Sequence, residues 1–375
     1  MTPNLRWDPC ISHTGDEAET FIASYFAEAH RKVVLIAAAG FDPRATIVAT
    51  QLAQVSSTPR AILIRENRPS PDPSLLERAE ANIAKFQEVM PNHELHQIDI
   101  FGTDGAVTGG RNTVNALTEI NFADATDIVV DVSALSVGTC FPLVGHLVHS
   151  VERKSLSANL HLIVAHNATF DGLIRALPSD TPSYVHGFKG GSTLDQAAEA
   201  AKLWLPQLAT GRQAALGRLF NFVKPNDTCP ILPFPASEPR LADRLVEEFL
   251  TEFAKDWEVD NRDIVFAAEE DPLDLYRTVL KLDDLRRPVF AGAGGSMLVL
   301  SPLGSKVMAV GALMASLERD LPVAYLESIG YELGEEVLGP INKANLIHIW
   351  LEGDVYPQPR PPLAANTRAR YDNVE

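Results

Sequence analysis

The chain of 375 residues contains few cysteines and comparatively few basic residues. Its three cysteines, Cys10, Cys140 and Cys229, are isolated and show no C-x-x-C spacing, which argues against a disulfide framework and a zinc site. Lysine and arginine number 32 against 49 acidic residues, for a net charge of -17. Non-specific binding to duplex nucleic acid needs a basic surface, so we expect no such partner. A small anionic ligand remains possible, because a pocket with two or three basic side chains can be positive on an acidic protein.

Long apolar runs and familiar catalytic motifs are also missing. No run approaches the 18 residues of a membrane span, and the start, MTPNLRWDPC, lacks the apolar segment of a signal peptide. We therefore expect a cytoplasmic protein without a membrane partner. The sequence has no G-x-S-x-G or H-E-x-x-H motif, and no G-x-G-x-x-G in a strand–turn–helix context. We expect no cofactor and no metal site, and the residues leave open whether the protein is an enzyme.

The sequence does contain a regular alternation of apolar runs and helical patterns. Residues 33–39 (VVLIAAA) form a continuous apolar run, which is typical of a strand buried on both faces of a parallel sheet. Helical segments separate this run from the next ones, an order that predicts βαβ units with a mainly parallel sheet. The remaining predicted strands of this half are residues 61–66, 94–101, 126–135 and 159–167.

The second half repeats the order of strand, turn and helix patterns of the first. Residues 296–318 mirror residues 127–152: each has an apolar strand, a serine, a small polar turn and an apolar helix. We therefore predict an α/β fold with two Rossmann-like, mainly parallel sheets in tandem, arising from a duplication. The predicted boundaries are 1–170 for the N-terminal half, 171–225 for a connector, 226–355 for the C-terminal half and 356–375 for a Pro-rich tail. Within the connector, residues 193–209 read as a helix and residues 216–223 as a strand.

Two acid-Pro-Arg turns are the first candidate site residues. Asp42-Pro43-Arg44 and Glu238-Pro239-Arg240 are each placed after the first strand of a half. In one interpretation Arg44 and Arg240 face an anion or a base in the crevice at the strand ends. In the other, the acid and the proline cap the helix while the arginine pairs with a nearby carboxylate.

Two serine-led turns are the second candidate. Ser301, Gly304, Ser305 and Lys306 lie between a predicted strand and a helix. Ligands of open α/β sheets bind outside the carboxyl ends of the strands, and the free N–H groups of a helix N-terminus attract phosphate. Lys306 adds a positive charge. The corresponding turn, from Ser133 to Thr139, has no lysine, so it is either a degenerate copy or a structural one.

The tandem arrangement and the 301–308 segment (SPLGSKVM) resemble the CRISPR-associated Rossmann-fold (CARF) sensor domains and their two-copy relatives, the SAVED domains. Gly304-Ser305-Lys306 is similar to the Gly-Thr-Lys-like turn of those families, whereas Gly138-Thr139-Cys140 lacks the lysine. The resemblance implies that the protein senses a cyclic oligonucleotide made during phage infection. The chain departs from these families in one respect, because no nuclease, TIR or protease domain is recognisable in it. We therefore expect the output to come from a separate effector protein, from a homo-oligomer or from the protein's own crevice.

Three functions follow from these patterns. The first is a nucleotide-sensing module of an antiviral system, with an anionic, nucleotide-like ligand in the crevice at the strand ends. The second is an enzyme that acts on a nucleotide or phosphorylated metabolite in the same crevice, through Asp42, Glu238 or Lys306. The third is a non-catalytic interaction subunit. The predicted ligand-binding residues are Ser301, Gly304, Ser305, Lys306, Arg240, Arg44, Asp42, Ser133 and Thr139.

Overall fold

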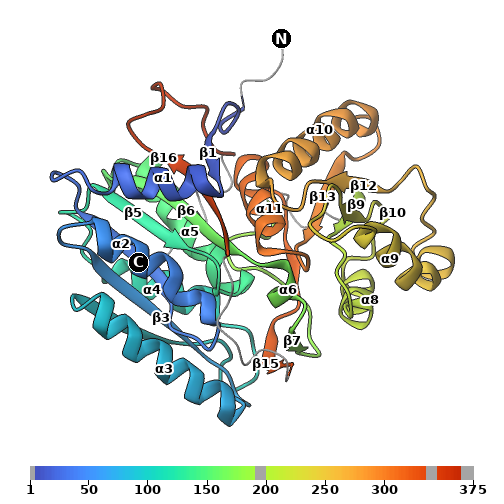
Figure 1. Cartoon of the computed structure of the whole chain (residues 1–375). Coiled ribbons are helices and arrows are strands. Elements are labelled where there is room, and N and C mark those ends of the chain that lie inside the picture. The colour runs from blue at the N-terminus through green and yellow to red at the C-terminus, as the bar shows by residue number, and fades with distance from the viewer. Residues whose placement is uncertain (1–4, 191–199, 335–343, 365–375) are drawn as a thin grey trace. The chain divides into compact units, whose positions relative to one another are not determined.

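The computed structural model of the chain describes residues 5–190, 200–334 and 344–364 (Figure 1). It divides into two compact units, one formed mainly by Met1–Leu177 with Ser328–Pro361 and the other by Pro178–Glu327. The division differs from the predicted one in two places. Residues 178–190 and 200–225, predicted to be connector, belong to the second unit, and residues 328–334 and 344–361 belong to the first. No helix within the described ranges has the length and apolar character to cross a membrane.

The first unit contains a seven-stranded sheet in the order β1-β16-β6-β5-β2-β3-β4. The five predicted strands are confirmed, and they run parallel. They are β2 (Val33–Ala38), β3 (Arg60–Asn67), β4 (His93–Asp99), β5 (Asp127–Asp131) and β6 (Asn159–His166).

Two further strands complete this sheet. β16 (Asn345–Glu352) pairs antiparallel with β6, and β1 (Ile11–Thr14) pairs antiparallel with β16. Sequence reasoning placed the β16 segment in the second half and predicted no strand at residues 11–14. Neither strand could be recognised locally, because each pairs with a partner that is distant in the sequence: more than 150 residues away for β16 with β6, and more than 300 away for β1 with β16.

Helices cover both faces of the sheet because its central strands are apolar on both sides. All six residues of β2 are buried. Val33, Leu35 and Ala37 pack in one core with α1 (Asp16–Tyr25), α2 (Ile47–Val55) and α3 (Pro73–Val89) (Figure 1). The other residues of β2 point to the opposite face, where right-handed crossovers place α4 (Gly109–Thr118) and α5 (Val137–Glu152).

Short elements follow β6 and lead out of the first unit and back. They are α6 (Ala168–Asp171), β7 (Ile174–Pro178) and β15 (Ser328–Leu333), with β7 paired to β15.

The second unit is also built on parallel strands. β9 (Ala201–Pro206) lies between β10 (Asp227–Thr228) and β13 (Ser296–Ser301), and β11 (Ile231–Pro233) pairs with β12 (Val265–Ala267). Parallel bridges join Gln207 to Ile231 and Leu300 to Val323. The remaining elements are β8 (Ser183–Tyr184), β14 (Ala324–Tyr325), α8 (Gln213–Val223), α9 (Leu241–Glu248), a π-helical turn (Glu252–Asp256), α10 (Pro272–Phe290) and α11 (Lys306–Arg319).

The strand order of the second unit corrects two predictions. Of the helix predicted at 193–209, residues 193–199 lie outside the described ranges and residues 201–206 form β9, while the predicted strand at 216–223 is α8. We count β9 as the first strand of this unit, β10 and β11 together as the second, β12 as the third, β13 as the fourth and β14 as the fifth. Across the sheet these strands follow the order third, second, first, fourth, fifth. The parallel strands of the first unit have the same Rossmann-like order. The α/β fold is therefore shown. The duplication itself stays a prediction.

Candidate functional site

Each unit has a point where the strand order reverses, and ligands of such sheets bind beside it, outside the carboxyl ends of the strands. In the first unit this point lies between β2 and β5. Asp42 follows β2 and precedes a 3-10 turn, Pro43–Thr46, and its carboxylate accepts a hydrogen bond of 2.9 Å from the Arg44 amide. Asp131 is the last residue of β5. Two acidic side chains therefore lie at or just after the carboxyl ends of the two strands that flank this reversal.

Arg44 is bound to carboxylates within the protein. Its side chain is 2% exposed, and it donates to Asp42 from Nε (3.0 Å) and Nη2 (2.7 Å) and to Asp171 from Nη1 (2.6 Å). Burial disfavours the charge, but the two carboxylates raise the pKa of Arg44 above its ordinary value. The structure agrees with the second interpretation of this turn: the acid and the proline cap it, and the arginine pairs with nearby carboxylates. A ligand contact of Arg44 would have to displace these partners.

Asp131 is the most perturbed carboxyl group at this edge. It is 1% exposed, and its Oδ1 accepts hydrogen bonds from the amide and the hydroxyl of Ser133, whereas Oδ2 has no hydrogen-bond partner among the described residues. Burial, aided by the nearby charge of Asp42, raises the pKa of Asp131 to about 7. The Ser133 hydroxyl is also engaged by the amide of Ala165. A buried acid that titrates near neutral pH at a strand-order reversal is typical of a functional site.

The helix N-terminus after β5 is occupied by an anion of the protein. Glu66, near the end of β3, accepts from the amide (3.0 Å) and the hydroxyl (2.8 Å) of Ser136, the N-cap of α5. Burial alone would raise the pKa of Glu66, but the charge of Arg68 and hydrogen bonds from Ser136 and Thr139 lower it. Glu66 thus fills the position at which a helix N-terminus would receive phosphate. The predicted ligand contact of Thr139 remains untested, and its described role is to support this carboxylate.

In the second unit the strand order reverses between β9 and β13. Ser301, the last residue of β13, is fully buried. Its hydroxyl accepts from Trp204 Nε1 and donates to the Ala324 carbonyl, both at 2.9 Å. Both functions of the hydroxyl are used to join β9, β13 and β14, so the described role of Ser301 is structural.

The turn that follows brings together the other predicted residues of this segment. Ser305 is the N-cap of α11 and accepts from the Met308 amide at 3.2 Å. Gly304 lies directly against Gln207, since a Cβ on Gly304 would be 3.2 Å from Gln207 Oε1. Lys306, half-buried, begins the helix. Small residues thus allow a close approach to the N-terminus of a long helix, where the Ser305 hydroxyl accepts a hydrogen bond from a first-turn amide.

Sequence reasoning missed Gln207 in this turn. Gln207 is 1% exposed and donates from Nε2 to the Met308 carbonyl (3.2 Å), which orients Oε1 toward Gly304 without a hydrogen-bond partner among the described residues. No local pattern marks a glutamine after a strand as a site residue. The signal would have been the assignment of residues 201–206 as a strand, which puts Gln207 at its carboxyl end.

The second acid-Pro-Arg turn does not correspond to the first. It follows β11, the second strand of its unit, whereas Asp42 follows the first strand. Arg240 is exposed and pairs with Asp243 at 3.4 Å, and Glu238 forms an ion pair with Arg244. The prediction that both turns follow the first strand of their half was therefore wrong. No contact among the described residues joins Arg240 to Ser301 or Lys306.

Comparisons with known proteins give limited information. No family model and no curated protein matches the chain. The cytoplasmic domain of a prokaryotic cation chloride cotransporter is similar over 80% of this chain and 96% of its own, at 12% identity and a TM-score of 0.24. A putative universal stress protein from Pseudomonas aeruginosa UCBPP-PA14 matches over 82% and 96%, at 10% identity and a TM-score of 0.21. The description of the fold therefore relies on the chain's own sheets.

Proposed function

We propose that this protein is a nucleotide-sensing module of an antiviral defence system, and that the ligand's phosphate binds at the Gly304–Lys306 turn of the second unit. The main support is the N-terminus of α11. It lies beside the reversal of strand order, presents first-turn amides that have no partner within the helix, and carries Lys306. Its helix dipole and lysine both favour an anion.

The charges of the two units support this choice of turn. In the first unit Glu66 occupies the helix N-terminus, and Arg44 is neutralised by Asp42 and Asp171 with Asp131 nearby. A phosphate there would meet carboxylates at short range. Buried carboxylates instead suit hydrogen-bond donors, such as sugar hydroxyls or the amino group of a base. We therefore propose that phosphate binds in the second unit and not at the carboxylates of the first.

The output of such a sensor would pass to a separate effector protein or to a second copy of this chain in the cytoplasm. The resemblance to CARF and SAVED domains and the Gly304-Ser305-Lys306 turn support a cyclic oligonucleotide as the ligand.

Native mass spectrometry for a co-purified nucleotide, followed by thermal shift with cyclic oligonucleotides, tests the proposal. We expect Lys306→Glu to weaken binding by at least about tenfold, equivalent to ~1.4 kcal/mol, because it reverses the charge at the turn. Lys281→Glu, an exposed position on α10, is the control and should bind as the wild type does. An unliganded spectrum together with no thermal shift for the whole panel would contradict the proposal.

A second candidate function is catalysis on a nucleotide or phosphorylated metabolite, and the observation that favours it is Asp131. A carboxyl group whose pKa is about 7 can accept and return a proton at neutral pH. Turnover of a nucleotide panel that is lost in Asp131→Asn, while Lys306→Glu weakens binding, would favour the enzyme. If neither binding nor turnover occurs, the interaction subunit is the remaining alternative.

A further inference from the structure

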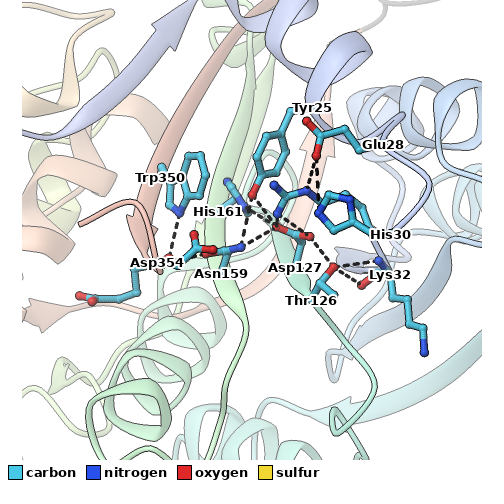
Figure 2. A network of polar contacts seen from close by, with 12 residues as sticks. Tyr25, Glu28, His30, Lys32, Thr126, Asp127, Asn159, His161, Trp350 and Asp354 are labelled. Atoms are coloured by element: carbon cyan, nitrogen blue, oxygen red, sulfur yellow. Dashed lines mark hydrogen bonds and ion pairs between the residues drawn. The ribbon is translucent and has the colours of Figure 1, made fainter. Parts of the chain in front are cut away.

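A chain of three imidazoles ends on a buried carboxylate at the opposite end of β5 from Asp131. Asp127, the first residue of β5, is fully buried (Figure 2). Its oxygens accept hydrogen bonds from Thr126 Oγ1 (2.6 Å), Tyr25 Oη (3.0 Å), Asn159 Nδ2 (3.1 Å), Arg31 Nη1 (3.3 Å) and His161 Nε2 (3.3 Å).

The imidazole chain runs from this carboxylate across three neighbouring strands. His161 Nδ1 lies 3.0 Å from His348 Nε2, and His348 Nδ1 lies 3.0 Å from His13 Nδ1. The residues belong to β6, β16 and β1, which are adjacent in the sheet, and His13 pairs directly with His348. His161 and His348 are fully buried, whereas His13 is half-buried. The chain therefore leads from the edge strand into the core.

The carboxylate determines the proton positions of all three rings. An ionised Asp127 only accepts, so His161 must carry its proton on Nε2, which leaves Nδ1 as an acceptor. His348 then donates from Nε2 and accepts at Nδ1. His13 must donate from Nδ1, and its Nε2 is left with a lone pair that can accept a proton.

The groups packed around the chain couple it to α1. The Phe21 ring stacks on His13 and His348, with centroids 4.6 and 4.3 Å apart, and the Arg31 guanidinium lies 3.7 Å over the Tyr25 ring. Burial lowers the pKa values of all three histidines. The charged and titratable groups that act on the imidazole chain are Glu17 and Tyr25 of α1, Arg31 after α1, Asp127 of β5 and Asp354 after β16.

We propose that His13, His348 and His161 form a proton relay, and that its charge state controls how firmly β1 and α1 are held to the sheet. His13 Nε2 takes a proton from water, and His13 passes its Nδ1 proton to His348 Nδ1. His348 passes its Nε2 proton to His161 Nδ1. One proton enters, and one extra proton ends on His161 as an imidazolium beside Asp127, which stays ionised.

The relay matters because it lets two buried rings respond to acid without unfolding. The new positive charge on His161 competes with Arg31 for the Asp127 carboxylate, and it repels the Arg31 guanidinium. Since Arg31 packs on Tyr25 of α1, a weaker hold of Asp127 on Arg31 loosens α1. β1 is an edge strand whose His13 contacts the chain directly, so it loosens with α1. The imidazole chain would thus release this edge of the first unit as the pH falls below the ordinary pKa of histidine.

Imidazole ¹⁵N NMR of the full-length chain near pH 7.5 tests the relay directly. We expect the Nε2–H tautomer for His161 and His348 and the Nδ1–H tautomer for His13. Finding His13 as the Nε2–H tautomer would overturn the proposal, because the relay would then run the wrong way. This measurement needs only the wild type, so it decides even if a variant does not fold.

Hydrogen exchange of β1 and α1 peptides tests the latch. Below about pH 6.5 the opening constant, corrected for intrinsic exchange, should rise up to about tenfold per pH unit for each histidine that titrates. His348→Gln should remove most of this dependence, because glutamine cannot pass the proton on. His30 is an exposed histidine outside the imidazole chain, so the control variant His30→Gln should retain the pH dependence. An unchanged pH slope in His348→Gln would refute the latch.

Discussion

The buried cluster around Arg44 gives a prediction whose size follows from its contacts. Arg44→Met keeps the length of the side chain but removes the charge that pairs with Asp42 and Asp171. Arg44 is 2% exposed, so water cannot replace the lost partner without a rearrangement. Removing one partner of a buried ion pair costs about 3–5 kcal/mol. We expect the first unit to lose stability in this range.

The loss should also depend on pH, with a sign that the cluster determines. In the wild type the pKa of Asp171 is lowered, because the nearby His166 imidazole and the charge of Arg44 together outweigh the effect of burial. Its stabilising contribution is therefore present above the unfolded pKa and is lost as pH falls through the folded one. Without Arg44, the orphaned carboxylates bind protons more readily. The gap between variant and wild type should be wider at about pH 8 than at about pH 5.

Urea titration followed by hydrogen exchange of β5 and β6 peptides measures this stability for the first unit separately. Arg240→Met is the matched control, because it changes the arginine of the similar but exposed turn, and it should leave the unfolding free energy unchanged. Adding Asp42→Asn to Arg44→Met should recover part of the loss. A gap below about 1 kcal/mol, or one that does not vary with pH, would refute the assignment of Arg44 as a buried charge partner.

Other substitutions test separate contacts. Asp131→Asn should stabilise the first unit by about 3 kcal/mol more at pH 8 than at pH 5. In the wild type, the folded state gains stability from keeping Asp131 protonated, and this gain is lost as the pH rises through the folded pKa of about 7. Urea titrations at both pH values measure the difference. Ser301→Ala should cost about 1–3 kcal/mol by leaving Trp204 Nε1 unpaired, with ligand affinity unchanged in calorimetry. Gly311→Ala should cost about 1–3 kcal/mol in thermal unfolding, since the new Cβ would meet the Pro272 carbonyl.

Local sequence signals were sufficient for the parallel strands of the first unit and failed at the start of the second unit. The run at residues 33–39 is apolar at every position, a pattern typical of a strand buried on both faces, and all six residues of β2 are buried. β9 is only six residues long and follows an alanine-rich stretch, which favoured a helix. The helical spacing of Leu216, Leu219 and Val223 was visible in the sequence, and these residues are the buried face of α8.

The candidate site was predicted only as far as its contacts are local. Asp42 caps its turn two residues away, and Ser305 caps α11 three residues away, so the sequence could indicate both. Glu66 reaches Ser136 across 70 positions, and Gln207 reaches Met308 across 101. No spacing rule encodes such pairs, because they depend on which strands become neighbours.

The sequence by itself determined the parallel strands of the first unit, its acid-Pro-Arg turn and the serine-capped helix of the second, because these depend on hydrophobic periodicity and on contacts within one turn. Only the tertiary structure decided that Arg44 serves two carboxylates and that Glu66 fills the first helix N-terminus. The same is true of the three histidines that meet in one line: His13 and His348 are 335 positions apart, and His161 and His348 are 187 apart. Burial and long-range strand pairing set the charge of each of these groups, and neither is written in the neighbouring residues.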